Sequence, residues 1–156
     1  MPLVTARAID VANKIVNEIN SMSTGLTFTA VRRWSFGFTD GELSSLQVVV
    51  RPYDMDRSEE ARGDEEHFYE IQVGVYKKVA RRNTAEIDDC YNLAINIAAE
   101  FPLNRVISVG AGDVEVVENR FMPMFVRTDR IMDNYDSSDT RFMSHLLLKF
   151  REYVDE

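Results

Sequence analysis

The stretch LQVVVRPYDMDRSEEARGDEEHFYEIQVGVYKKV, residues 46–79, decides the fold. Leu46, Val48 and Val50 alternate with Gln47, Val49 and Arg51, and a second alternation runs from Tyr69 to Tyr76. Such alternation is the period of a strand that buries one face. The sequence therefore predicts two strands, paired antiparallel. Pro52 is expected to close the first, because proline cannot donate to a strand ladder.

Thirteen residues between these strands carry most of the chain's excess negative charge. Seven acids minus two arginines give -5 of the formal net charge of -8. The acids are Asp54, Asp56, Glu59, Glu60, Asp64, Glu65 and Glu66. A hairpin needs only about two to five connecting residues, and a loop beyond about twelve is usually functional or disordered. We predict one long acidic hairpin loop that acts through charge and reach, with a merely solvated loop as the alternative.

Two helices are predicted from apolar residues three and four positions apart. Residues 4–20 carry such a stripe through Ala12, Ile15 and Ile19. Residues 84–101 carry a stronger one, with Thr84 as the expected N-cap and Pro102 after the last turn.

Three further strands are expected. FTAVRRWSF, residues 28–36, alternates poorly, which favours an edge strand or one covered by a partner. The following FTDGE is typical of a turn. A short strand is expected around residues 114–118 and a closing strand over residues 142–150, where apolar residues also repeat every four positions, as in a helix.

Together these elements predict an α+β fold in one domain, residues 1–156. Its sheet is mixed and mainly antiparallel, with about four to five strands packed against two main helices. The residues expected in the core are Ile15, Ile19, Val48, Val50, Ile71, Val73, Ile97 and Leu146.

The composition limits the classes of protein that fit. With a net charge of -8, the chain lacks the basic surface that tight phosphate binding requires. No apolar run approaches the ~20 residues of a membrane span, and the N-terminal residues lack the pattern of a signal peptide. Cys90 is the only cysteine, which excludes an internal disulfide. A reducing compartment, or a particle assembled in one, is expected.

The motifs that would carry catalysis are weak. His67 and His145 are the only histidines; the first is expected at the solvated surface and the second packed or exposed in the closing strand. Cys90 lies on the apolar helix face and is expected in the core. GAGD, residues 110–113, lacks the third glycine of a pyrophosphate loop and is expected to be a tight turn. These residues predict no catalytic site, cofactor or metal.

One enzymatic alternative is open. Asp54 and Asp56 lie two residues apart, and Glu70 lies on the next predicted strand. Carboxylates on adjoining strands hold Mg²⁺ for phosphodiester cleavage in metal-dependent nucleases. A nuclease of that kind commonly has a lysine two residues beyond the carboxylate, where Gln72 stands here.

Basic and aromatic residues cluster at VRRW, residues 31–34, and KKVARR, residues 77–82. Trp34 could stack a nucleic-acid base, but these basic residues balance nearby acids, so a contact between proteins is preferred. Large side chains without clean alternation support this, since exposed apolar patches usually mark interfaces. The predicted interface residues are Arg32, Arg33, Trp34, Phe36, Lys77, Lys78, Phe121 and Phe125. A small stand-alone binding domain is a third possibility.

Three stretches in this order resemble the tail terminator proteins, also called tail-completion or neck proteins, of tailed bacteriophages. They are LSSLQVVVRP at 43–52, IQVGVYKKV at 71–79 and AEIDDCYNLAINIA at 85–98. The resemblance covers residues 4–101, with a weaker match in FMSHLLLKFREY at 142–153. Residues 121–139 are longer and more apolar than in that family, which leaves open a long-tail cap or a neck adaptor.

The resemblance implies a small α+β structural protein of the virion, not an enzyme. It implies a ring, commonly a homohexamer, that caps the tail tube or joins it to the head-side connector or neck proteins, with no membrane involved. DNA would pass through the ring without specific binding. The ring would be assembled in the host cytoplasm. The acidic loop would then lie at the lumen, where it would repel DNA phosphates, or at a docking face.

Overall fold

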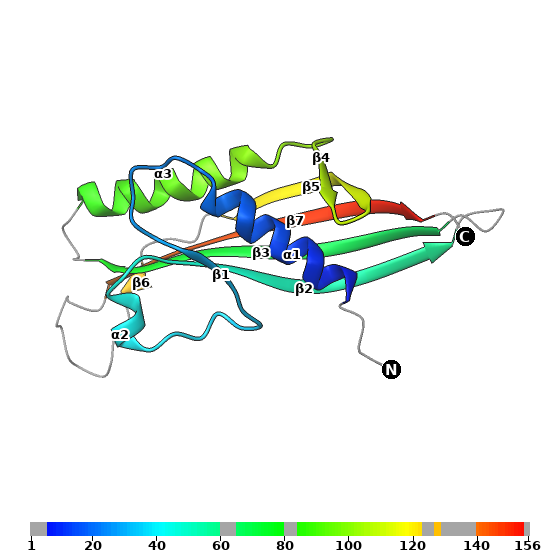
Figure 1. The fold of residues 1–156 in the computed structure, drawn as a ribbon. Coiled ribbons are helices and arrows are strands. Elements are labelled where there is room, and N and C mark those ends of the chain that lie inside the picture. Colours follow the sequence, from blue (N-terminus) through cyan, green and yellow to red (C-terminus); the bar gives the residue numbers. More distant parts are fainter. Residues whose placement is uncertain (1–5, 60–64, 80–83, 123–126, 129–139, 155–156) are drawn as a thin grey trace.

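The computed structural model describes residues 6–59, 65–79, 84–122, 127–128 and 140–154 (Figure 1). The helices are α1 (Arg7–Asn20), α2 (Asp40–Leu43) and α3 (Thr84–Glu100). The strands are β1 (Ala30–Arg32), β2 (Gln47–Glu59), β3 (Glu65–Val79), β4 (Val106–Val109), β5 (Gly112–Met122), β6 (Arg127–Thr128) and β7 (Thr140–Val154).

The described strands form one sheet in the order β1-β2-β3-β7-β5-β4, with β6 paired to β7. β1 runs parallel to β2, and the other described pairs are antiparallel. The predicted α+β class with a mainly antiparallel sheet is confirmed. The described part of the chain holds more elements than the expected four to five strands and two helices. The additions are short, namely β4, β6 and α2, which overlaps the predicted turn.

α1 and α3 pack on one face of the sheet, and the main core lies beneath them (Figure 1). All eight residues predicted for the core are buried, and none is more than 3% exposed. The closing strand is confirmed as β7, because its alternate residues from Phe142 to Phe150 point into this core. β1 lies at the edge of the sheet, as its poor alternation predicted.

The prediction that Pro52 closes its strand is wrong. β2 continues to Glu59, with Pro52 opposite Ile71 and a β-bulge before Asp54. The Val50 carbonyl accepts a hydrogen bond of 3.0 Å from the Arg33 amide. Main-chain groups two residues apart in a strand point to the same side, so Pro52 faces past the end of β1. Proline is tolerated there because no described neighbouring strand needs its missing N–H group.

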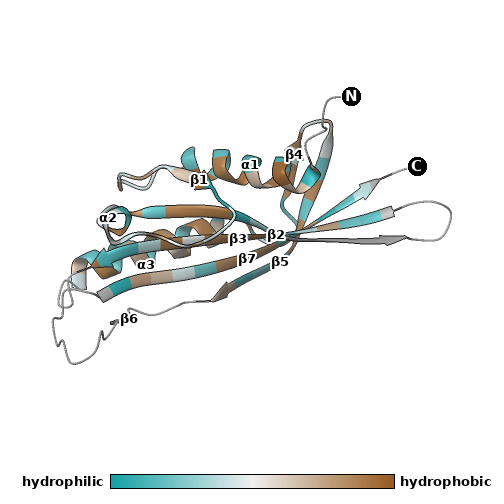
Figure 2. Ribbon diagram, turned by 90° about the horizontal axis from the view of Figure 1, so that it is seen from below, coloured by the Kyte–Doolittle hydropathy of each residue, from teal (hydrophilic) through white to brown (hydrophobic). Residues whose placement is uncertain are grey.

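The predicted thirteen-residue acidic loop is largely a strand pair. β2 and β3 stay paired as far as Glu59 opposite Glu65, and β7 runs beside β3 with Val154 opposite Glu65. We call residues 54–66 the acidic arm. The strands that carry it project beyond the helices (Figure 2). The prediction failed because a strand that extends past the core buries neither face and needs no apolar alternation.

Residues 33–46 cover part of the opposite face of the sheet. Phe36 stacks on His145 and tilts against Tyr76, with ring centroids 5.0 and 5.5 Å apart. Gly74 permits this approach, because a Cβ there would lie 3.0 Å from a ring carbon of Phe36 and closer still to Tyr76. This segment therefore forms a small second cluster behind the edge strand β1.

Candidate interaction surfaces

Two pairs of side chains lie near the end of β1, Arg32 with Trp34 on the helix side of the sheet and Arg51 with Tyr53 on the other side. We call them the edge patch. β1 pairs Arg32 with Val50 and stops, so Arg51 and Tyr53 follow on β2 where the described edge is open. Trp34 and Tyr53 are 61% and 51% exposed. Arg32 and Trp34 were predicted as interface residues, whereas Arg51 and Tyr53 were not singled out from the sequence.

Neither arginine of the edge patch has a carboxylate partner among the described side chains. Arg32 donates from Nε to Asn13 Oδ1 at 3.0 Å and lies 5.5 Å from the Trp34 ring centre. Arg51 lies 5.6 Å from the ring centres of Phe36 and Tyr53, and its buried Nε has no described acceptor. Contacts with aromatic faces hold a guanidinium in place without neutralising it. The edge patch therefore presents positive charge next to exposed aromatic rings.

The cluster behind the edge patch is satisfied within the chain. The Tyr76 hydroxyl and His145 Nε2 are hydrogen-bonded. Burial, and then the charge of Arg51, lowers the pKa of His145, so its ring is neutral in the folded chain at neutral pH. Burial raises the pKa of Tyr76. His145 is therefore packed inside the chain. Phe36, a predicted interface residue, packs against Tyr76 and His145 of its own chain.

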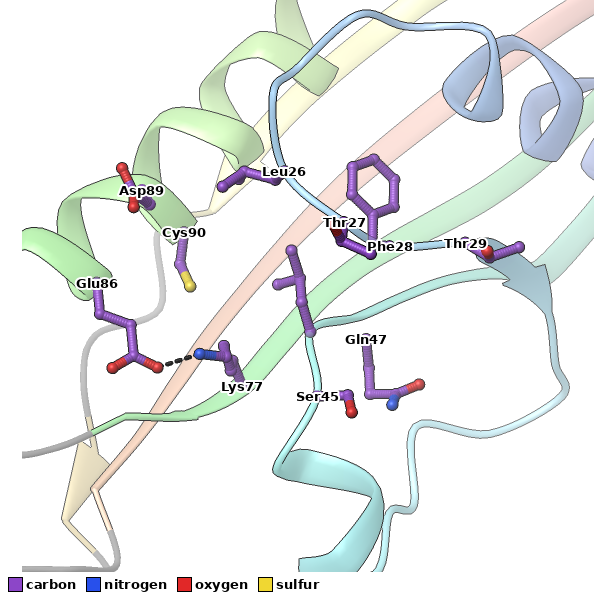
Figure 3. Close-up of a pocket in the computed structure, with 11 residues that line it drawn as sticks. Leu26, Thr27, Phe28, Thr29, Ser45, Gln47, Lys77, Glu86, Asp89 and Cys90 are labelled. Carbon is purple, nitrogen blue, oxygen red and sulfur yellow. Dashed lines mark hydrogen bonds and ion pairs between the residues drawn. The ribbon is translucent and has the colours of Figure 1, made fainter.

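Two more predicted interface residues have internal partners. Arg33 forms an ion pair with Glu42 at 3.2 Å and lies 5.0 Å from the Phe38 ring centre. Lys77 pairs with Glu86 beside a pocket of about 670 Å³ (Figure 3). The pocket lies between α3, residues 26–29 and the start of β2. Lys78, also predicted, is partly buried.

The thiol of Cys90 lines the same pocket (Figure 3). The residue is buried, as predicted, and burial raises the pKa of its thiol to about 11. A thiol with such a pKa is protonated at neutral pH and is a poor nucleophile. Cys90 therefore acts as a small apolar group of the core.

Phe121 lies on β5, towards the other edge of the sheet. Phe121 is partly buried against the core and meets Tyr91 of α3 edge-on, with ring centroids 6.3 Å apart. Phe125 lies outside the described residues. The predicted turn at GAGD is confirmed, because residues 110 and 111 join β4 to β5 with Gly110 at a φ of 61°.

Only one acid of the acidic arm has a described side chain. Glu66 pairs with Arg151 at 3.5 Å, and Arg151 also pairs with Glu115 at 3.1 Å. Hydrogen bonding to Glu115 raises the pKa of Arg151. Glu66 is therefore tied into the sheet rather than free for a partner. The side chains of Asp54, Asp56, Glu59, Glu60, Asp64 and Glu65 lie outside the described residues.

A buried charged cluster was missed from the sequence. Glu152, 7% exposed, accepts hydrogen bonds from Arg7 Nη2 at 2.6 Å and from the Tyr69 hydroxyl at 3.0 Å. The bond to Glu152 raises the pKa of Arg7, and burial raises that of Tyr69. His67, expected to be solvated, is partly buried with Nδ1 3.4 Å from the Tyr69 hydroxyl. The signal was present, since Glu152 continues the inward phase of β7.

For the nuclease alternative, the structure shows only where the backbone of the candidate residues lies. The β2–β3 register puts Asp54 opposite Glu70, but the side chains of Asp54 and Asp56 are not described. Within the described residues, no three His, Cys, Asp or Glu side chains are grouped so as to hold a metal ion. No described helix is long and apolar enough to cross a membrane.

The fold matches solved structures from end to end. One is a chain in the virion of a native gene transfer agent particle, with a TM-score of 0.56, 16% identity, and 98% of this chain aligned to 100% of that one. A second solved chain matches with a TM-score of 0.55 and 16% identity over 99% of both chains. At this identity the likeness concerns the fold. No family model and no curated protein matches the sequence.

Proposed function

We propose that the protein is a structural component of a phage-like virion, a tail terminator or neck protein that assembles into a ring at the head–tail junction. The observation that carries the proposal is the end-to-end fold match to a chain of a gene transfer agent virion. The alignment leaves almost no part of either chain over, so the two proteins share a whole architecture rather than one common motif. The resemblance of residues 4–101 to tail terminators points to the same kind of part.

In this proposal the chain forms a ring, most simply a homohexamer. The ring caps the tail tube or joins it to the connector or neck proteins, and DNA passes through it without specific binding. The protein is then located in the virion after assembly in the host cytoplasm, and no membrane is involved. The net charge of -8 supports passage without binding, because phosphates are repelled by a predominantly acidic ring.

We also propose that the protein has no enzymatic activity and needs no cofactor. Its only thiol is buried and protonated, and both histidines are engaged in packed contacts with tyrosine. The described groups that most often act as nucleophile or general base are thus used for packing.

The test is loss and restoration of the gene in the phage or prophage that encodes it. Without the protein, we expect electron micrographs to show filled heads and tails that are not joined, and infectivity to fall by orders of magnitude. Antibody labelling should place the restored protein at the head–tail junction. Joined, infective particles in its absence would contradict the proposal.

A matched variant separates this role from the nuclease alternative. Glu70→Gln removes the only carboxylate of that candidate site with a described side chain while keeping its shape. The variant should restore joined particles as well as the wild-type protein does. Failure to restore them, together with Mg²⁺-dependent DNA cleavage by the wild-type protein alone, would favour the nuclease.

A further inference from the structure

Residues 33–46, which we call the strap, contact the sheet mainly through side chains. They lie on the side of the sheet away from α1 and α3 (Figure 1). The amide of Arg33 donates to the Val50 carbonyl, and pairing with the sheet resumes only where β2 begins at Gln47. The described main-chain hydrogen bonds in between join strap residues to one another. The strap can therefore open at the cost of a few side-chain contacts and without breaking a strand ladder.

An imidazole lies at the contact between the strap and the sheet. The Phe36 ring stacks on His145 with centroids 5.0 Å apart, and Phe38 lies 4.9 Å from the Tyr76 ring centre. Beneath the strap, His145 Nε2 and the Tyr76 hydroxyl are hydrogen-bonded. Val49 and Tyr76, on the same face of the sheet, are only 0% and 6% exposed. The closed strap thus shields both an apolar part of the sheet and a titratable ring.

The groups around His145 offer a proton no compensating charge. From β2, the Arg51 guanidinium lies 5.6 Å from the Phe36 ring centre, so its positive charge is already present beside the cluster. From β3, burial raises the pKa of Tyr76, which is therefore neutral. The remaining elements contribute, from β5, Met122 opposite His145 and, from the strap, the ion pair of Arg33 with Glu42. Among the described side chains, no carboxylate is thus left to pair with an imidazolium here.

We propose that protonation of His145 opens the strap. An imidazolium under the closed strap would be a second positive charge beside the Phe36 ring, cut off from water and without a counter-ion. Opening returns the ring to water, where it binds a proton as an ordinary histidine does. The neutral ring favours the closed state and the protonated ring the open one, so acid uncovers Val49 and Tyr76. The inference does not depend on the ring assembly proposed above.

Hydrogen exchange of the full-length chain measures the opening. The amides of Glu42 and Leu43 donate to Thr39 inside the strap and report on it. Because the ordinary pKa of histidine is 6.5, the opening constant should rise by up to about tenfold from about pH 7.5 to about pH 5.5. Rates are corrected for the intrinsic effect of pH on exchange. Amides of β3 should stay protected over this range, because the sheet itself remains folded.

Variants of the two histidines decide the outcome. In His145→Asn the exchange of the strap should not rise with acid, whereas His67→Asn, the matched control, should behave like the wild-type chain. An equal rise in His145→Asn, or flat exchange in the wild-type chain, overturns the proposal. So does loss of protection in β3 together with the strap, which would be global unfolding. If His145→Asn fails to fold by circular dichroism, NMR titration of the wild-type ring replaces it. The rise should then end at the pH where His145 of the folded chain titrates, and a protonated ring under a protected strap overturns the proposal.

Discussion

Glu152 joins three separate parts of the chain through one carboxylate. It binds Arg7 at the start of α1 and Tyr69 on β3. Glu152 itself lies near the end of β7 and points inward, like Phe150 before it. A buried carboxylate is costly unless its oxygens are paired, and here both are. The cluster therefore fixes how α1 docks on the strands at the base of the acidic arm.

We predict that Glu152→Gln lowers the free energy of unfolding by about 1–3 kcal/mol, because it removes the charge that satisfies Arg7 and Tyr69. The matched control is Glu118→Gln, whose carboxylate pairs at 3.8 Å with an exposed Arg120. That change should cost less than about 0.5 kcal/mol. Urea unfolding measures both, and equal effects would show that the buried cluster does not stabilise the fold.

His145 makes stability depend on pH. Its pKa is lowered in the folded chain from an ordinary value of 6.5, so below that pH the unfolded chain binds a proton that the folded chain does not. Stability is full above pH 6.5 and is lost as the pH falls through the folded pKa. The slope is at most about 1.4 kcal/mol per pH unit. His145→Asn should flatten this decline and His67→Asn should preserve it. An unchanged pH profile in His145→Asn would refute the prediction.

α3 offers an internal comparison at the scale of one element. Ile97 is 1% exposed beneath the helix, whereas Ile95, two residues earlier, is 39% exposed on its outer side. Ile97→Ala should cost about 2–5 kcal/mol, because it leaves a cavity in the core. Ile95→Ala should cost less than about 0.5 kcal/mol. Similar losses for the two variants in chemical unfolding would mean that the inward face of α3 is misassigned.

The elements that could be predicted from the sequence are those that pack on the core. β3, β7, α1 and α3 each bury one face, so their apolar residues repeat with the period of the element. The missed parts lack that signal. β2 beyond Pro52 runs outside the core, and β4 has only two inward residues, Ile107 and Val109. The alternation that identifies a strand is a consequence of burial, and it fades where the strand leaves the core.

Only two of the four residues of the edge patch could be predicted from the sequence. Arg32 and Trp34 stand out as a basic and aromatic pair in the sequence, but Arg51 and Tyr53 look like the ordinary end of a strand. What brings both pairs to the same edge of the sheet is the parallel pairing of β1 with β2, which sets Arg32 beside Val50. That pairing brings together residues about twenty positions apart, and no local pattern specifies it. Glu66 was misjudged for a similar reason, since its partner Arg151 lies on β7.

At the scale of the whole molecule, the fold separates a packed body from a charged projection. The helices, the core and the aromatic cluster occupy one part, and the described acidic arm continues β2 and β3, with β7 paired beside β3 (Figure 1). Paired strands, rather than a thirteen-residue loop, therefore carry the described part of this charged segment.

We predict that the arm can lose its charge without loss of the fold. The variant replaces Asp54, Asp56, Glu59, Glu60, Asp64 and Glu65 by their amides and keeps Glu66, which pairs with Arg151. Its free energy of unfolding should stay within about 1 kcal/mol of the wild-type value, since solvated charges contribute little to stability. Complementation of a phage that lacks the protein should nevertheless give few joined particles. The opposite change, Arg57→Gln and Arg62→Gln, makes the arm more acidic and should complement fully. Normal particle yields from the amide variant would reduce the arm to ordinary solvated surface.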